Sequence, residues 1–218
     1  TLLQLLPPAV YRRSLTADVR WAVPAVTVQD SPRFTWRGVM LDVSRHFMPK
    51  HDVLRMIDLL AMHRINTLHL HLTDDQGWRV EILRYPRLTE VGSWRRESQL
   101  GAKDDSPGDG RPHGGFYTQG DIREIVSYAA ERHIGVVPEI DVPGHSQAAI
   151  AAYPSLGITG EPLGVHTRWG INPNVLNTEE STIEFYRGVF DEVMDLFPGQ
   201  VIGLGGDECP KEQWRTDS

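Results

Sequence analysis

Two adjacent carboxylates near the end of the sequence, Asp207 and Glu208, are the residues best suited to acid–base chemistry. They follow a short run of aliphatic residues interleaved with glycine, residues 201–204, which is typical of a buried strand. Neighbouring side chains of a strand point to opposite faces, so both acids reach one substrate only if the Gly205-Gly206 pair bends the chain. An isolated Asp-Glu pair after a strand is otherwise typical of a solvated turn.

Polar clusters also follow other predicted strands. Asp74 and Asp75 come directly after one of them, and Trp78 lies close behind. Paired carboxylates beside a tryptophan suit a sugar, because the acids bind hydroxyl groups while the indole packs against the ring. His145 lies in a Pro-Gly turn soon after Asp141. A histidine beside acids at the end of a strand is as often functional as structural.

His69 and His71 lie on the same face of one strand, because the side-chain period of a strand is two residues. Two such histidines could hold a metal ion, which would make the protein a metal-dependent barrel hydrolase. They could equally fill the polar interior of a parallel barrel. Glu139 is left open as a buried partner for Arg37 or Arg45 rather than a catalytic acid.

The order of the predicted elements indicates an α/β fold. Strands are predicted at residues 38–43, 67–72, 135–141 and 201–209, and helices at residues 53–62, 121–133 and 181–196. This alternation predicts a parallel sheet. The polar clusters follow the strands, and a (β/α)8 barrel builds its active site at that side. A doubly wound sheet is the competing fold, but no Gly-x-Gly-x-x-Gly turn follows a strand.

One predicted loop, residues 84–116, is unusually long and rich in glycine, proline and charge. A loop of this length inside a compact domain is usually functional or disordered. Thr118, just after it, is predicted to cap the N-terminus of the next helix.

Composition excludes several classes of protein. Lys and Arg number 22 against 29 Asp and Glu, so the net charge is −7 and no general attraction to nucleic acid or an anionic membrane is expected. The apolar runs fall well short of the roughly 18 residues that a membrane helix needs, and the N-terminus lacks the basic start of a signal peptide. Cys209 is the single cysteine, which excludes an intrachain disulfide and predicts a buried neutral thiol.

Four motifs in this order carry a resemblance to a known family. They are Trp-Arg-Gly at 36–38 leading to Leu-Asp-Val-Ser-Arg-His-Phe at 41–47, His-Leu-His-Leu-Thr-Asp-Asp-Gln-Gly-Trp at 69–78, Pro-Glu-Ile-Asp-Val-Pro-Gly-His at 138–145, and Gly-Gly-Asp-Glu at 205–208. The sequence resembles glycoside hydrolase family 20, the β-N-acetylhexosaminidases, especially the bacterial branch. The resemblance implies a (β/α)8 TIM barrel and no metal or other cofactor, which returns His69 and His71 to a structural role.

The resemblance also implies the reaction. Family 20 enzymes remove terminal, non-reducing β-linked N-acetylhexosamine, either GlcNAc or GalNAc, with retention of configuration. The acetamido oxygen of the substrate attacks the anomeric carbon and forms an oxazolinium intermediate. By resemblance, Glu208 is the general acid and later the base that activates water. Asp207 orients the acetamido group, which fits two adjacent acids that address different parts of one sugar.

Further site residues are assigned by the same resemblance. Arg37 matches the arginine that binds the outer hydroxyls of the sugar, and its several donors suit that task. Asp74 and His145 match residues that form a supporting network to the acid and tune its pKa. Asp141 is assigned to the same network and to the substrate side of the site, and Trp78 is predicted to stack on the sugar.

The resemblance covers residues 34–209 and predicts two domains. Residues 1–34 resemble the end of a preceding α/β domain and its linker, and residues 35–218 resemble a partial catalytic barrel. A full barrel needs about 250 residues, so we expect about four of its eight βα units here. The tryptophans, tyrosine and aspartate that the family carries further along have no counterpart, so completion by a C-terminal half or another chain is expected.

The expected partner is a glycan with a terminal β-GlcNAc or β-GalNAc, and the resemblance favours a secreted or periplasmic location. Residues 1–218 alone are expected to be poorly active. One alternative is therefore a catalytically incomplete fragment that binds N-acetylglucosamine without turnover. The other is the metal-dependent hydrolase, which a chelator would inactivate.

Overall fold

The computed structural model describes residues 2–12, 14–206 and 208–216. The chain divides into two compact units, Thr1–Thr35 and Trp36–Ser218. The first unit contains the short helix α1 (Leu2–Leu5) and the 3₁₀ turn η1 (Pro8–Tyr11). Helix α1 ends just before Pro7 and Pro8, which cannot donate the backbone hydrogen bonds that would continue it.

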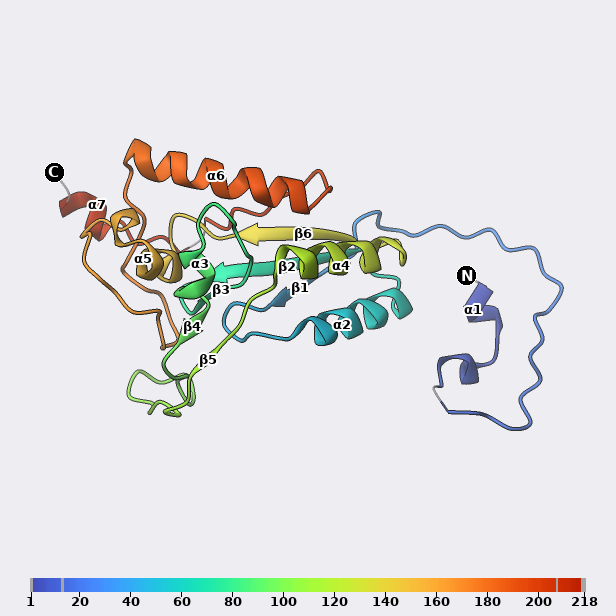
Figure 1. Ribbon diagram of the computed structural model, residues 1–218. Coiled ribbons are helices and arrows are strands. Elements are labelled where there is room, and N and C mark those ends of the chain that lie inside the picture. The colour runs from blue at the N-terminus through green and yellow to red at the C-terminus, as the bar shows by residue number, and fades with distance from the viewer. Residues whose placement is uncertain (1, 13, 207, 217–218) are drawn as a thin grey trace. The chain divides into compact units, whose positions relative to one another are not determined.

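The second unit is built on a parallel sheet (Figure 1). Strand β2 (Thr67–Asp74) lies between β1 (Gly38–Asp42) and β6 (Gly135–Ile140), and it runs parallel to both. Residues 67–71 of β2 pair in register with residues 38–42 of β1 and with residues 135–139 of β6. The three strands therefore end at the same edge of the sheet, which brings their following turns together.

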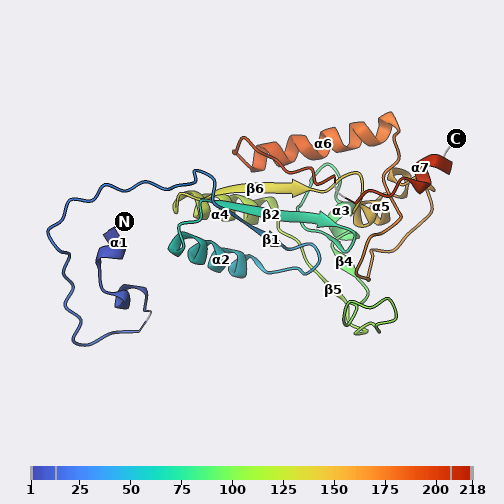
Figure 2. The same cartoon turned by 180° about the vertical axis from the view of Figure 1, so that it is seen from behind.

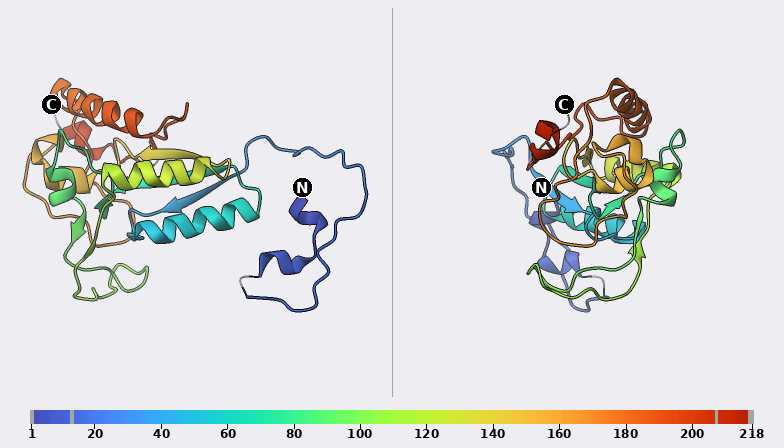
Figure 3. Two further views of the ribbon diagram at one scale, coloured as in Figure 1. Left: turned by 45° about the vertical axis from the view of Figure 1, so that its right-hand side comes forward. Right: turned by 90° about the vertical axis from the view of Figure 1, so that its left-hand side faces the viewer.

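Three long helices connect the strands: α2 (Lys50–Met62), α4 (Gln119–Ala130) and α6 (Glu180–Leu196). Helix α4 lies in front of the strands in Figure 1 and behind them in Figure 2. Residues of all three helices join the buried cluster that contains Leu68, Leu70 and Leu72, so the helices cover the same face of the sheet. The end-on view in Figure 3 shows the same arrangement. Helix α4 begins at a capping box, in which Thr118 and Asp121 each bond the backbone N–H of the other, as predicted for Thr118.

Consecutive strands are neighbours in the sheet, and all three long helices cover the same face. A doubly wound sheet would place helices on both faces and would reverse its strand order. The arrangement of β1, β2 and β6 is instead that of a barrel wall. The α/β alternation predicted from the sequence is confirmed for these strands and helices.

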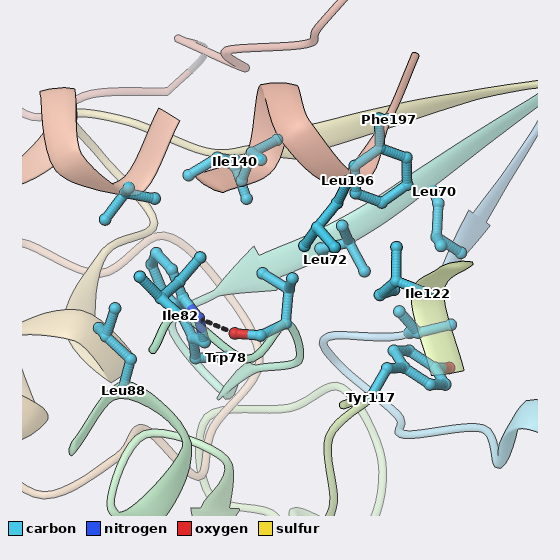
Figure 4. Close-up of a cluster of buried hydrophobic side chains, with 14 of the residues drawn as sticks. Leu70, Leu72, Trp78, Ile82, Leu88, Tyr117, Ile122, Ile140, Leu196 and Phe197 are labelled. Carbon is cyan, nitrogen blue, oxygen red and sulfur yellow. Dashed lines mark hydrogen bonds between the residues drawn. The ribbon is translucent and has the colours of Figure 1, made fainter. Parts of the chain in front are cut away.

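Alternation along β2 explains how the core forms. Leu68, Leu70 and Leu72 point to the helical face and are completely buried, whereas His69 and His71 occupy the opposite face. Figure 4 shows part of this core, in which Leu70 and Leu72 lie near Ile122, Leu196 and Phe197. Each buried aliphatic side chain contributes on the order of 2 kcal/mol through removal from water.

The segments that follow the strands contain the shorter elements. These are β3 (Gly77–Trp78), α3 (Arg87–Glu90), the hairpin of β4 (Trp94–Arg95) with β5 (His113–Gly114), α5 (Gln147–Ala152), η2 (Pro154–Leu156) and α7 (Glu212–Thr216). The long predicted loop of residues 84–116 thus contains α3 and a short hairpin. Nowhere in the described ranges does a helix reach the length and apolarity needed to cross a bilayer.

The predicted strand at residues 201–209 is only partly formed. Gly203 exchanges backbone hydrogen bonds with Pro138 and Ile140, and Leu204 O accepts one from Val142 N, so the segment lies beside β6. Its side chains were expected to be buried, but Leu204 is 53% exposed. The described residues supply no further strand along its outer edge, so the segment is bonded on one side and its side chains lack cover.

Candidate active site

The turn that carries Glu208 depends on glycine. Gly205 and Gly206 have φ values of +61° and +91°, in the left-handed region that favours glycine. A Cβ on Gly205 would lie 2.0 Å from Asp141 Oδ1, and Gly206 N donates a hydrogen bond to the same oxygen at 3.2 Å. Asp141 therefore positions this turn. Asp207, the predicted partner of Glu208, lies outside the described residues.

Glu208 meets His145 at the end of this turn. The distance from Glu208 Oε2 to His145 Nε2 is 3.4 Å, and the Glu208 side chain is 54% exposed whereas that of His145 is 4% exposed. Both residues have a φ of +48°, which is uncommon for residues other than glycine and concentrates at functional sites. A half-exposed carboxylate held against a buried imidazole has the geometry of a group that exchanges protons with a substrate.

His145 is fixed from behind by two buried carboxylates. Its Nδ1 lies 3.3 Å from Asp74 Oδ1 and 3.2 Å from Asp75 Oδ2. Hydrogen bonds to Asp74 and Asp75 outweigh burial and raise the pKa of His145 to about 11. The ring is therefore a cation at neutral pH, and its charge faces Glu208.

Asp74 is the centre of the charged network. Its side chain is completely buried and accepts from His145, from His71 Nε2 at 2.8 Å and from Arg45 Nη2 at 2.8 Å. Burial alone would raise the pKa of Asp74, but hydrogen bonds from His145 and His71 and the charge of Arg45 outweigh burial and lower it. Asp74 is thus a permanent anion that orders three cations around it.

His71 connects this network to β6. Its Nδ1 lies 2.9 Å from Glu139 Oε2, an oxygen that also bonds His69 Nε2. Burial would lower the pKa of His71, but the hydrogen bonds to Asp74 and Glu139 raise it to about 9. The described side-chain partners of the Glu139 carboxylate are these two histidines. The predicted partner was Arg37 or Arg45, so the structure corrects this prediction.

The same contacts bear on metal binding. His71, Glu139 and Asp141 each place one ligand atom within 4.8 Å of the others, as do Asp74, Asp75 and His145, so either group has the spacing of a cation site. The predicted pair of His69 with His71 is not one of these groups. A metal ion binds an imidazole nitrogen that carries no proton. Both nitrogens of His71 contact carboxylates, and the pKa of His71 is about 9, so the ring holds both protons at neutral pH. This donor set fits a protonated structural histidine better than a metal ligand.

Arg45 reaches the site from the turn after β1. Asp42 Oδ1 accepts from the backbone N–H groups of Ser44 and Arg45, and this local turn directs the arginine side chain toward Asp74. Arg45 bonds Asp42 Oδ2 at 2.9 Å and keeps a side chain that is 31% exposed. Its remaining N–H groups can bind hydroxyl oxygens of a ligand.

A cavity of about 170 Å³ opens beside Glu208. Glu208, His145 and Arg45 form part of its wall. The rest of the wall consists of Gln76 and of Trp169, Gly170 and Ile171. The cavity offers a proton donor or acceptor, a guanidinium and an exposed indole. That combination suits a sugar whose glycosidic oxygen lies at Glu208.

Comparison with known proteins gives the family. Residues 34–218 match the description "Glycosyl hydrolase family 20, catalytic domain". The chain belongs to glycosyl hydrolase family 20.

Relatives within the family are similar over most of the chain. A beta-hexosaminidase of Porphyromonas gingivalis is 47% identical over 219 residues, covering 100% of this chain and 27% of the relative. A beta-hexosaminidase of Akkermansia muciniphila is 43% identical over 194 residues, covering 88% of this chain and 38% of the relative. The family 20 chain thus spans less than half the length of the curated relatives that it matches here.

Solved structures of family 20 proteins show the same fold. The N-acetyl-beta-hexosaminidase of Streptomyces plicatus, in complex with Thio-NAglucal, superposes with a TM-score of 0.84 and 41% identity, covering 98% of this chain and 41% of that one. The beta-N-acetylhexosaminidase of Streptomyces coelicolor A3(2) superposes with a TM-score of 0.82 and 42% identity, covering 95% and 40%. The family 20 chain is therefore part of an α/β catalytic domain of the TIM-barrel type.

The structure corrects the prediction for Arg37. This residue precedes β1, its Nε donates to Arg64 O at 2.7 Å, and its backbone N–H donates to Asn66 Oδ1. Those partners lie just before β2, at the opposite end of the sheet from Asp74. Five residues of β1 at about 3.3 Å each separate the two ends by about 17 Å. The arginine that lines the cavity beside Glu208 is Arg45.

The structure also corrects the prediction for Trp78. Its side chain is 1% exposed and lies among core residues such as Ile82 and Leu88, and its indole nitrogen donates to Val80 O at 2.7 Å (Figure 4). A ring without exposed faces cannot stack on a sugar. Trp78 enters the core because β3 turns back antiparallel to the end of β2 and directs the indole away from the site.

Three residues of the cavity wall, Arg45, Gln76 and Trp169, were not predicted from the sequence as site residues. Gln76 follows the paired aspartates and lines the cavity, and Trp169 lies in an irregular segment without periodic pattern. Arg45 had a usable signal, because it follows a strand as Asp74 and His145 do. Trp169 had none, since its position depends on how the segment after α5 folds back over the site.

Proposed function

We propose that this protein hydrolyses terminal β-linked N-acetylhexosamine from the non-reducing ends of glycans. The observation that carries the proposal is the contact of Glu208 with the buried His145–Asp74 pair at the cavity. Relatives named beta-hexosaminidase support the choice of sugar. Glu208 would donate a proton to the glycosidic oxygen and later remove one from the attacking water.

The charged network suits this double role. The cationic ring of His145 stabilises the carboxylate that remains after Glu208 has given up its proton. Asp74 keeps that ring charged and fixed, because its hydrogen bond prevents rotation of the imidazole. Arg45 would bind the outer hydroxyls of the sugar and thereby orient the ring toward Glu208.

We further propose that the acetamido group of the substrate is the nucleophile. Two residues adjacent in the sequence cannot easily flank a glycosidic bond as acid and nucleophile, which the usual retaining mechanism requires. Asp207 would instead orient the acetamido group, whose oxygen attacks the anomeric carbon and forms an oxazolinium ion. Water then opens this ion from the side that the leaving group occupied, so the product retains its configuration.

The chain would supply about four of the eight βα units of the barrel, and further sequence would close the site. This proposal is supported by coverage: the chain matches only 27% of the Porphyromonas gingivalis relative and 41% of the Streptomyces plicatus structure. The boundary of an N-terminal domain near residue 34 is part of the same proposal. A fragment that binds N-acetylglucosamine without turnover is the corresponding description of residues 1–218 alone.

The test is hydrolysis of an aryl β-N-acetylglucosaminide by a chain extended through the whole barrel and by residues 1–218. The extended chain should be active, and Glu208→Gln should reduce kcat by about 10²- to 10⁴-fold, the usual contribution of general acid–base catalysis. The matched control is Glu131→Gln on the surface after α4, which should leave kcat unchanged. Full activity after Glu208→Gln would contradict the proposal, and loss of activity with a chelator would favour the metal-dependent alternative.

A further inference from the structure

A second, larger cavity adjoins the candidate active site. It has a volume of about 370 Å³, which is within the range of about 300–1,000 Å³ for ligand sites. Arg45, Gln76 and Trp169 line both cavities, so the two share one wall. The other walls come from residues 95–102, within the long loop predicted at residues 84–116, and from residues 167–169.

The larger cavity is positively charged. Arg45, Arg95 and Arg168 line it, and no described residue of its wall is a carboxylate. Arg45 is neutralised by ion pairs with Asp42 and Asp74. Within the described part of the chain, neither Arg95 nor Arg168 has a carboxylate oxygen within 4.0 Å.

Arg95 differs from an arginine that serves structure alone. Arg79 is fully buried and donates to five backbone carbonyl groups, which occupies its donors. Arg95 is 6% exposed and makes three contacts with neutral oxygens, two with Ser98 Oγ and one with Gln76 O. Of the five N–H donors of a guanidinium, two therefore remain at the cavity wall. Asp109 attracts Arg95 electrostatically without forming an ion pair within 4.0 Å. Burial of this cation therefore still costs free energy, which an anionic ligand at the cavity would offset.

Two neutral groups of the wall suit a sugar. Gln76 is 6% exposed, and its Oε1 has no hydrogen-bond partner among the described residues, although its Nε2 donates to Arg168 O. Trp169 is 64% exposed and offers a face on which a sugar ring can pack. The cavity thus combines an aromatic surface with positive charge, and Gln76 Oε1 is a buried acceptor of its wall without a partner among the described residues.

We propose that this cavity is a second glycan subsite that selects substrates with an anionic group, a carboxylate or a sulfate ester, on or next to the terminal N-acetylhexosamine. Arg95 and Arg168 bind the anion, Gln76 Oε1 accepts from a hydroxyl, and Trp169 packs against the ring. This inference rests on the proposed function, because it places the subsite beside the bond that Glu208 cleaves.

The experiment measures kcat/KM of the chain extended through the whole barrel on matched pairs of substrates. One pair is an aryl β-N-acetylglucosaminide with and without a 6-O-sulfate, which places the charge on the terminal sugar. The other is GlcNAc β-linked to glucuronic acid or to glucose, which places the charge on the neighbouring sugar. We expect one anionic substrate to exceed its neutral counterpart by about tenfold, the usual size of a hydrogen bond to a charged group.

Arg168→Gln is the main variant, because Arg168 is exposed and its loss should leave the fold intact. It should reduce the ratio of kcat/KM on the anionic substrate to kcat/KM on the neutral one by about tenfold. Arg95→Gln should act in the same direction. Arg96→Gln removes the same charge from a side chain that is 81% exposed and outside this cavity, so it should leave the preference intact.

The results separate the two proposals. Hydrolysis of the neutral aryl substrate with no preference in either pair would overturn the subsite and leave the proposed function standing. Absence of hydrolysis on all four substrates would overturn both. A preference that persists in Arg168→Gln and in Arg95→Gln would also overturn the assignment. A preference in the first pair alone or in the second pair alone supports the subsite and shows which sugar carries the anion.

Discussion

Arg37 and Arg45 flank the same strand, and their surroundings differ completely. Arg37, before β1, bonds the backbone of Arg64 in the connection that leads into β2. Arg45, after β1, bonds Asp42 and Asp74 and lines the cavity beside Glu208. The residue type is the same, so the difference comes from the end of the sheet at which each arginine lies.

Parallel strands explain why the two ends differ. Strands β1, β2 and β6 all finish at one edge, so the turns that follow them meet there and bring Arg45, Asp74 and His145 together. The opposite edge collects the turns that enter the strands. The candidate catalytic side chains therefore lie together at the carboxyl ends of the strands, while residues at the amino ends connect backbone segments and stabilise the fold.

The sharpest test of this comparison replaces each arginine in the chain extended through the whole barrel. Arg45→Gln should lower kcat/KM on an aryl β-N-acetylglucosaminide by about a hundredfold, because two or more hydrogen bonds from a charged donor to the sugar are lost. Arg37→Gln should change kcat/KM less than about threefold and act only on stability. Steady-state kinetics give kcat/KM for both variants. A larger loss of kcat/KM in Arg37→Gln than in Arg45→Gln would contradict the proposal that Arg45 binds the sugar.

Trp78 tests whether location at the carboxyl end is sufficient for a role in the site. It follows β2 as Asp74 does, but it is buried in the core. Trp78→Phe should lower the free energy of unfolding by about 2 kcal/mol, because it leaves a small cavity and removes the hydrogen bond to Val80 O. The KM of the extended chain should stay the same. Urea unfolding and kinetics measure the two effects, and a raised KM with unchanged stability would restore Trp78 to the site.

A smaller effect is expected from the protonation of His71. The pKa of His71 is about 9 in the folded chain, against 6.5 for an unperturbed histidine. Between these pH values the folded state therefore binds more protons than the unfolded state. Its contribution to stability is complete below pH 6.5, falls as the pH rises and is lost above about pH 9. The slope should be steepest near pH 8, at about 1.2 kcal/mol per pH unit, because a full proton difference between the two states gives about 1.4.

The measurement is the free energy of unfolding of the extended chain at several pH values between 6 and 10. His71→Asn is the matched variant, because it keeps a hydrogen-bonding side chain that does not titrate. The difference in stability between the two proteins should shrink as the pH rises. A constant difference over this range would show that folding does not shift the pKa of His71.

Much of the framework was predictable because local patterns determine it. The alternation in residues 67–72 and the helical periodicity of residues 53–62 are properties of short segments, and both predicted elements are present. The segment after Pro198 was predicted less well. Its aliphatic pattern indicates a strand, but pairing depends on neighbours, and the described residues provide one only on the side of β6.

The sequence by itself determined which residues could do the chemistry and that they follow parallel strands. Composition and motif order place Asp74, His145 and Glu208 in one site, because parallel strands bring the turns that follow them to one edge. The tertiary structure decided that Arg45 rather than Arg37 joins them and that Trp78 belongs to the core. Those outcomes depend on the direction of a turn and the face of a strand, which are set by packing between segments far apart in the chain.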